Sequence, residues 1–174
     1  MDSNKVFESL QEIAQTSATK VKQEKVGQFI QDELFRNTVE YALNPHKVYG
    51  VIPQHDWITV NGTAQFDNQT FELLDDLIAR RITGHAARDA ILYELARLEA
   101  PSANLLVDVI KKDLRAGFSE STVNKVYKDL IPEYSYMRCS TLNKIKPEKF
   151  NWKKGIFSQI KMDGMYANGN ILDD

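Results

Sequence analysis

A buried helix is predicted most clearly by the stretch Pro101-Ser-Ala-Asn-Leu-Leu-Val-Asp-Val-Ile-Lys-Lys-Asp-Leu-Arg-Ala-Gly117. Proline fits the first turn of a helix, and glycine is the usual left-handed stop after one. The apolar side chains between these two residues recur at helical spacing, so one face should pack in a core. That face consists of Leu105, Leu106, Val109, Ile110 and Leu114.

Further helices are predicted on both sides of this stretch. Asn4 can cap a first helix, which Thr16 and Ser17 interrupt, and a second carries apolar residues between 21 and 30. We expect others over residues 32–42, 71–82 and 85–99, and one more that begins after Ser119. Residues 46–70 contain turn signals and short β-branched segments, which indicate irregular or extended structure. His46 and His55 lie there without partners at metal-ligand spacing, so we interpret both as ordinary surface histidines.

The composition is that of a globular protein, since 43% of the 174 residues are hydrophobic and 26% are charged. No apolar run approaches the roughly 18 residues that cross a membrane. The N-terminus lacks the basic and then apolar pattern of a signal peptide. The single cysteine, Cys139, excludes a disulfide framework and a cysteine zinc site. We therefore expect a cytoplasmic monomer that has no membrane partner and no metal site of its own.

The net charge of −2 conceals an asymmetry along the chain. Residues 1–100 carry 10 basic and 15 acidic side chains, whereas residues 101–174 carry 12 and 9. Between Arg138 and Lys161 there are seven basic residues and a single acidic one, Glu148. Such a cluster is either a footprint for phosphate or nucleic acid, or a solvated loop.

The character of the sequence changes after Pro132. Short extended segments follow, then a basic loop, and then the predicted strand Ser158-Gln-Ile-Lys-Met-Asp-Gly-Met-Tyr166, which leads to a hairpin signal at Asn168-Gly169. We therefore predict a mainly α fold with two parts. Residues 1–131 form a compact multi-helix domain, and residues 132–174 form a short β-containing piece that is too small for a complete core of its own.

Two glycine turns that lead into helices are candidate phosphate sites. One is the segment 113–119, and the other runs from Arg81 through Thr83 and Gly84 to His85. Free backbone N–H groups and the helix dipole at a helix start attract anions. Each turn is equally compatible with a routine connection between two helices.

Lys161 and Asp163 share one face of the predicted strand, because alternate side chains point the same way. A charged pair of this kind can be a solvated strand edge. Alternatively, Lys161 is a nucleophile, which requires a deprotonated amine and therefore neighbouring cations or desolvation. The strand alone leaves both readings open.

The string Lys161-Met-Asp-Gly164 matches the K-x-D-G core of the covalent nucleotidyltransferases, which include ATP-dependent DNA ligases, RNA ligases and capping enzymes. The segments before it match more specifically. Four segments resemble, in order and spacing, the N-terminal DNA-binding domain of the T-even phage ATP-dependent DNA ligases. They are Arg81–Ala87, Asp113–Ser119, Asn124–Tyr127 and Leu130–Glu133. RNA ligases and capping enzymes lack a helical domain before the lysine, so this order favours a DNA ligase.

The resemblance implies roles for individual residues. Lys161 would be adenylated by ATP with Mg²⁺ and would pass AMP to the 5′-phosphate of a nick in double-stranded DNA. Ile160, Asp163 and Tyr166 would lie at the nucleotide, although the family's motif usually ends in arginine where this chain has Tyr166. The expected contacts to the DNA backbone are Arg81, Thr83, Gly84, His85, Arg115, Gly117, Ser119, Asn124 and Lys125.

The later motifs of that family do not fit in the ten residues after Gly164. We therefore expect the chain by itself to be inactive, to bind no cofactor, and to represent the front third of a ligase acting in a phage-infected cytoplasm. One alternative is a stand-alone DNA-binding or regulatory module derived from a ligase. A further alternative is a helical protein-interaction domain without a nucleic-acid role.

Overall fold

The computed structural model describes residues 1–59, 62–133, 148 and 151–155. The chain divides into two units, residues 1–134 and 135–174, and each is considered by itself. The predicted domain boundary after residue 131 stays a prediction. The strand that carries Lys161 and the hairpin at Asn168-Gly169 lie outside the described residues.

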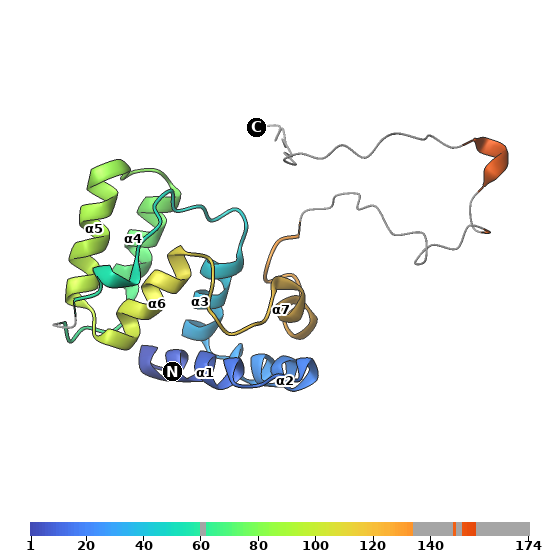
Figure 1. The fold of residues 1–174 in the computed structure, drawn as a ribbon, viewed down its shortest axis with the longest axis horizontal. Coiled ribbons are helices and arrows are strands. Elements are labelled where there is room, and N and C mark those ends of the chain that lie inside the picture. The colour runs from blue at the N-terminus through green and yellow to red at the C-terminus, as the bar shows by residue number, and fades with distance from the viewer. Residues whose placement is uncertain (60–61, 134–147, 149–150, 156–174) are drawn as a thin grey trace. The chain divides into compact units, whose positions relative to one another are not determined.

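Seven α-helices make up most of the described chain, so the prediction of a mainly α fold is confirmed for these residues (Figure 1). Their bounds are α1 Ser3–Ala14, α2 Thr19–Phe29, α3 Glu33–Leu43, α4 Asn68–Ile78, α5 Gly84–Arg97, α6 Ala100–Ile110 and α7 Glu120–Val126. Two short 3₁₀ helices, η1 His55–Trp57 and η4 Trp152–Lys154, complete the described elements. None of the described helices is long and apolar enough to cross a membrane.

The central element of the first unit is α6, which packs against α1, α3 and α5 (Figure 1). Eight of its eleven residues are buried, from Ser102 and Ala103 to the continuous run Leu105–Ile110. Helices α4 and α5 pack against each other, and α2 packs against α7. The predicted core face of this stretch is therefore correct, including Leu114, which is buried beyond the end of the helix.

Three aspartates fix the beginnings of helices. The side chain of Asp2 accepts a hydrogen bond from the backbone N–H of Lys5, and Asp32 and Asp67 cap α3 and α4 in the same way. The predicted cap Asn4 is wrong, because Asn4 lies inside α1. Helix α4 also begins three residues earlier than predicted, since the cap at Asp67 was not recognised.

Helix α6 ends at Ile110 and does not extend to Gly117 as predicted. Lys112 adopts a left-handed backbone conformation with φ of 62°, and this ends the helix before the glycine is reached. Arg115 and Gly117 are also left-handed, with φ of 53° and 66°. The chain from 111 to 119 is therefore a connection whose left-handed residues set its path between α6 and α7. This path positions the candidate site.

The irregular stretch before α4 is held by long-range hydrogen bonds. Ala64 forms an isolated bridge with Leu98: its N–H donates to the carbonyl of Arg97, and its own carbonyl accepts from Glu99. The N–H of Phe66 donates to the hydroxyls of Ser3 and Ser102, which are hydrogen-bonded to each other at 2.8 Å. These bonds satisfy backbone groups that no helix or sheet serves.

Candidate nucleic-acid interface

The described candidate residues lie in two places, the start of α5 and the connection from α6 into α7. Arg81, Thr83, Gly84 and His85 belong to the first, and Arg115, Gly117, Ser119, Asn124 and Lys125 belong to the second. The predicted nucleotide residues Ile160, Lys161, Asp163 and Tyr166 lie outside the described residues.

Residues 83–86 at the start of α5 are exposed, and the first N–H groups of a helix have no partner within it. Thr83 is the N-cap but makes no side-chain capping bond, and the first turn carries no acidic residue. Gly84 has a φ of 58°, and open space surrounds the position of a side chain there. The glycine is thus required by backbone conformation, not by crowding. Arg81 pairs with Asp76, with both side chains largely exposed.

The turn at 113–117 is held by three contacts. The Asp113 carboxylate accepts a hydrogen bond of 2.9 Å from the backbone N–H of Arg115. The Lys22 ammonium, from α2, donates to the carbonyls of Ala116 at 2.9 Å and Gly117 at 3.1 Å. A Cβ atom on Gly117 would lie 2.5 Å from that ammonium nitrogen. Sequence patterns gave no sign of Lys22, because its partners lie more than 90 residues away.

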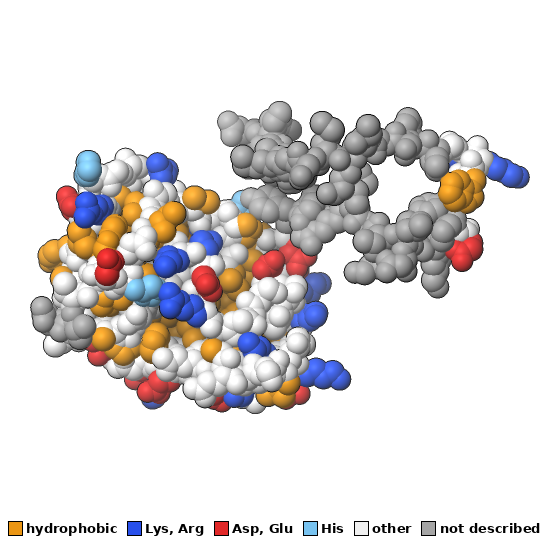
Figure 2. Space-filling view, in the orientation of Figure 1, with side chains coloured by type: hydrophobic (Ala, Val, Ile, Leu, Met, Phe, Trp, Pro, Cys, Tyr) orange, Lys and Arg blue, Asp and Glu red, His pale blue; other side chains and the backbone are white. Residues whose placement is uncertain are grey.

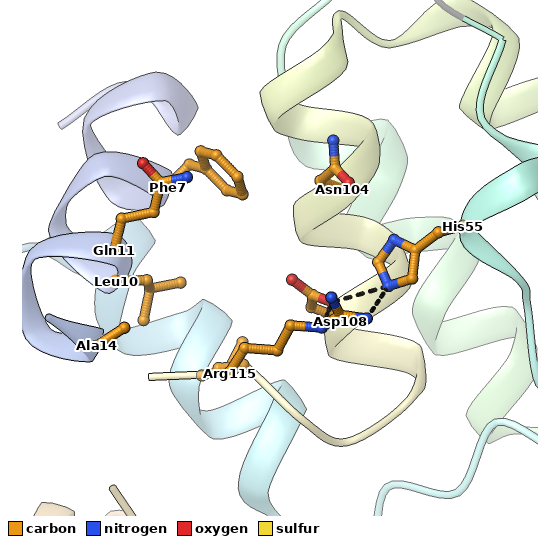
Figure 3. A pocket seen from close by; sticks show the side chains of 9 residues that line it. Phe7, Leu10, Gln11, Ala14, His55, Asn104, Asp108 and Arg115 are labelled. Atoms are coloured by element: carbon orange, nitrogen blue, oxygen red, sulfur yellow. Dashed lines mark hydrogen bonds and ion pairs between the residues drawn. The ribbon is translucent and has the colours of Figure 1, made fainter. Parts of the chain in front are cut away.

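Arg115 meets His55 and Asp108 at the edge of a pocket between α1, α6 and η1 (Figure 3). An Nη atom of Arg115 lies 2.5 Å from His55 Nε2, and Arg115 Nε lies 3.4 Å from Asp108 Oδ1. Burial raises the pKa of Asp108, and the charge of Arg115 opposes that rise. The interpretation of His55 as an ordinary surface histidine is therefore wrong. Only the folded arrangement brings a loop histidine to Arg115.

Lys112, between the end of α6 and the glycine turn, is bonded to the end of α3. Its ammonium donates to the carbonyls of Tyr41 at 3.1 Å and Asn44 at 2.6 Å, at the end of α3. Burial, followed by the charge of Lys47, lowers its pKa to about 8 against the attraction of Glu40. This lysine therefore serves the fold and is turned away from solvent.

Helix α7 presents Ser119, Asn124 and Lys125 in different ways. The Ser119 hydroxyl lies 3.0 Å from the Ser121 hydroxyl and makes no capping bond. Asn124 exchanges two hydrogen bonds with the backbone of Ile131, so its amide is structural. Lys125 is exposed. Helix α7 has seven residues, and Lys125 lies in its last turn.

On the face drawn in Figure 2, Lys and Arg side chains alternate with Asp and Glu side chains over the described residues. A broad positive surface would give long-range attraction to nucleic acid. The face in this view has mixed charges and no such broad positive area over the described residues. Among the described residues, no group of three or more His, Cys, Asp or Glu side chains could hold a metal ion.

Comparison with known proteins shows that the chain is similar to DNA ligases of bacteriophages. It is 28% identical, over 97% of its length, to the DNA ligases of Enterobacteria phages T4 and T6. The resemblance to the T-even phage DNA ligases is confirmed. The chain spans about 36% of the length of these ligases. No family model matches the chain.

Two solved structures resemble the fold and share 28% sequence identity with this chain. Pmar-Lig_PreS3 superposes with a TM-score of 0.66 over 73% of this chain and 31% of its own. Pmar-Lig_Pre superposes with a TM-score of 0.63 over 71% and 29%. In each case the similarity covers a minor part of the longer protein.

Proposed function

We propose that the helical unit binds the backbone of duplex DNA beside a nick, as the N-terminal part of an ATP-dependent DNA ligase. The observation that carries this proposal is the similarity to the T4 and T6 DNA ligases along 97% of the chain. In the complete enzyme Lys161 would accept AMP from ATP with Mg²⁺, as the motif resemblance implies. The described residues contribute to DNA binding alone.

The chemistry of the two turns supports backbone contact without base reading. Phosphate oxygens are bound by backbone N–H groups, hydroxyls and cations, and such contacts fix position without reading sequence. The first N–H groups of α5 and the exposed side chains of Arg115 and Lys125 supply these types of donor. Binding should therefore be independent of sequence and weakened by salt.

Fluorescence anisotropy with labelled intact and nicked duplexes of one sequence tests this proposal. Affinity should fall steeply between about 50 and 200 mM salt, and the nicked duplex should bind more tightly. Replacing Arg115 and Lys125 together by alanine should weaken binding about tenfold and reduce the salt slope by about 2.

The matched control replaces Lys5 and Lys20, which are exposed lysines of α1 and α2 outside the predicted contacts. It removes the same two charges and should change the affinity much less. Absence of a salt-sensitive signal with both duplexes, or equal losses in the two double variants, would contradict the proposal.

A further inference from the structure

A histidine that is 60 residues away in sequence meets the Arg115 side chain beside Asp108 (Figure 3). His55 comes from η1, Asp108 from α6, and Arg115 from the turn that follows α6. Asp108 Oδ1 lies 3.4 Å both from His55 Nε2 and from Arg115 Nε. The contact is therefore a three-membered cluster.

The donor and acceptor roles in this cluster follow from the chemistry of arginine. A guanidinium can only donate, so His55 Nε2 must accept the 2.5 Å hydrogen bond from Arg115. The ring is then neutral, with its proton on Nδ1. Asp108 attracts the guanidinium by charge, since its Oδ1 makes no hydrogen bond with any described residue.

Exposure differs sharply within the cluster. The Asp108 side chain is 10% exposed, whereas the Arg115 side chain is 58% exposed. Arginine carries five N–H donors. One is used on His55 and Nε lies beside Asp108, so three donors make no hydrogen bond with a described residue. The backbone of Arg115 is also fixed in a left-handed conformation by the Asp113 carboxylate.

We propose that His55, supported by the charge of Asp108, is a positioning residue that holds Arg115 ready for a DNA phosphate, an inference that rests on the proposed function. A free arginine side chain loses much rotational freedom when it binds phosphate. Anchoring the guanidinium beforehand removes part of that loss. His55 itself contributes no charge to the contact, because its ring is neutral in this arrangement.

DNA affinity of the full chain provides the first test. His55→Ala should weaken duplex binding up to about threefold, no more than Arg115→Ala itself, because His55 acts only through Arg115. His55→Gln retains a side-chain acceptor and should stay within about twofold of wild type. In an Arg115→Ala background, His55→Ala should cause no further loss. No loss in the wild-type background, or the same loss in both backgrounds, would overturn the positioning role.

Nuclear magnetic resonance of the arginine Nε–Hε groups tests the contact without DNA. Arg115 should show a restrained signal in wild type and His55→Gln, and a mobile one in His55→Ala, while the Arg97 signal serves as an internal control. An Arg115 signal unchanged in His55→Ala would overturn the positioning role. Wild-type chain that binds no duplex overturns the proposed function itself, whereas wild-type binding with an unaffected His55→Ala overturns the positioning role alone.

Discussion

The Lys112 ammonium nitrogen lies 2.6 Å from the carbonyl oxygen of Asn44, at the end of α3. The same nitrogen serves the carbonyl of Tyr41, while its chain neighbours Lys111 and Asp113 continue into the candidate DNA-binding turn. One lysine therefore joins the end of one helix to the turn that follows another.

Lys112 should give the fold an unusual dependence on pH. Its pKa of about 8 in the folded chain is below the usual 10.5, so between these values the unfolded chain holds the proton more often than the folded chain. The free energy of unfolding should then rise from about pH 8 to about pH 9.5. The neutral amine keeps two donors for its two carbonyl partners. Urea unfolding at successive pH values should show this rise in wild type and not in Lys112→Met.

Two tyrosines set the upper limit of the pH range in which the free energy of unfolding should rise. Burial raises the pKa of Tyr41 and Tyr49 in the folded chain. Near pH 10 the unfolded chain ionises at these residues first, so stability should fall there. A stability that stays flat from pH 7.5 to about pH 9.5 would contradict the assignment for Lys112.

Lys112 should also make no contribution to DNA affinity. Its ammonium is directed at two carbonyls of the fold, so Lys112→Met should change duplex affinity at neutral pH by less than about twofold and leave the salt slope unchanged. Anisotropy titrations beside Arg115→Ala check this. A reduced salt slope in Lys112→Met, with an intact fold by circular dichroism, would show that the ammonium does reach phosphate.

Arg97 should matter far more to stability than Arg81. Arg97 donates to Glu94, which is 2% exposed, and to Asp67, the N-cap of α4. Arg97→Met leaves a buried carboxylate with Thr70 as its remaining side-chain donor and should cost about 3 kcal/mol. Arg81→Met breaks a pair whose side chains are 60% and 41% exposed and should cost under about 1 kcal/mol. Comparable losses in urea unfolding would refute this ranking.

Alanine substitutions at Gly84 and Gly117 should distinguish the stability cost of backbone strain from that of steric crowding. Both have positive φ, at 58° and 66°, so alanine at either position should cost about 1 kcal/mol from strain. At Gly117 the new Cβ also displaces Lys22 from two carbonyls, which should bring the cost to about 2 kcal/mol. Thermal unfolding of the two variants should therefore rank Gly117→Ala below Gly84→Ala. The reverse order would show that Lys22 relaxes freely.

The predictable part of the fold is the part encoded in local patterns. Apolar spacing identified the buried face of α6, including Leu105 and Leu106, because helix periodicity is a property of neighbours in sequence. The end of α6 was misplaced, because the left-handed conformation of Lys112 depends on carbonyl partners about 70 residues away. The local sequence favours Gly117 as the end of helix α6, whereas long-range hydrogen bonds of Lys112 end the helix earlier.

In the candidate site too, the features set by local sequence could be predicted and those set by long-range contacts could not. The turns at Gly84 and Gly117 were found from residue type, since positive φ favours glycine. The partners that hold the second turn, Lys22 and His55, come from segments whose sequences give no sign of a role. Such contacts arise only when α2 and η1 are packed in place.

The hydrogen bond between Ser3 and Ser102 joins residues 99 positions apart in the chain, and it has a consequence for the order of events during synthesis. Helix α1 leaves the ribosome about 100 residues before its packing partner α6. Contacts between neighbours such as α4 and α5 can form early, whereas closing a long loop delays distant ones. We therefore expect the contact between α1 and α6 to form only after α6 emerges, so that the core is completed late in synthesis.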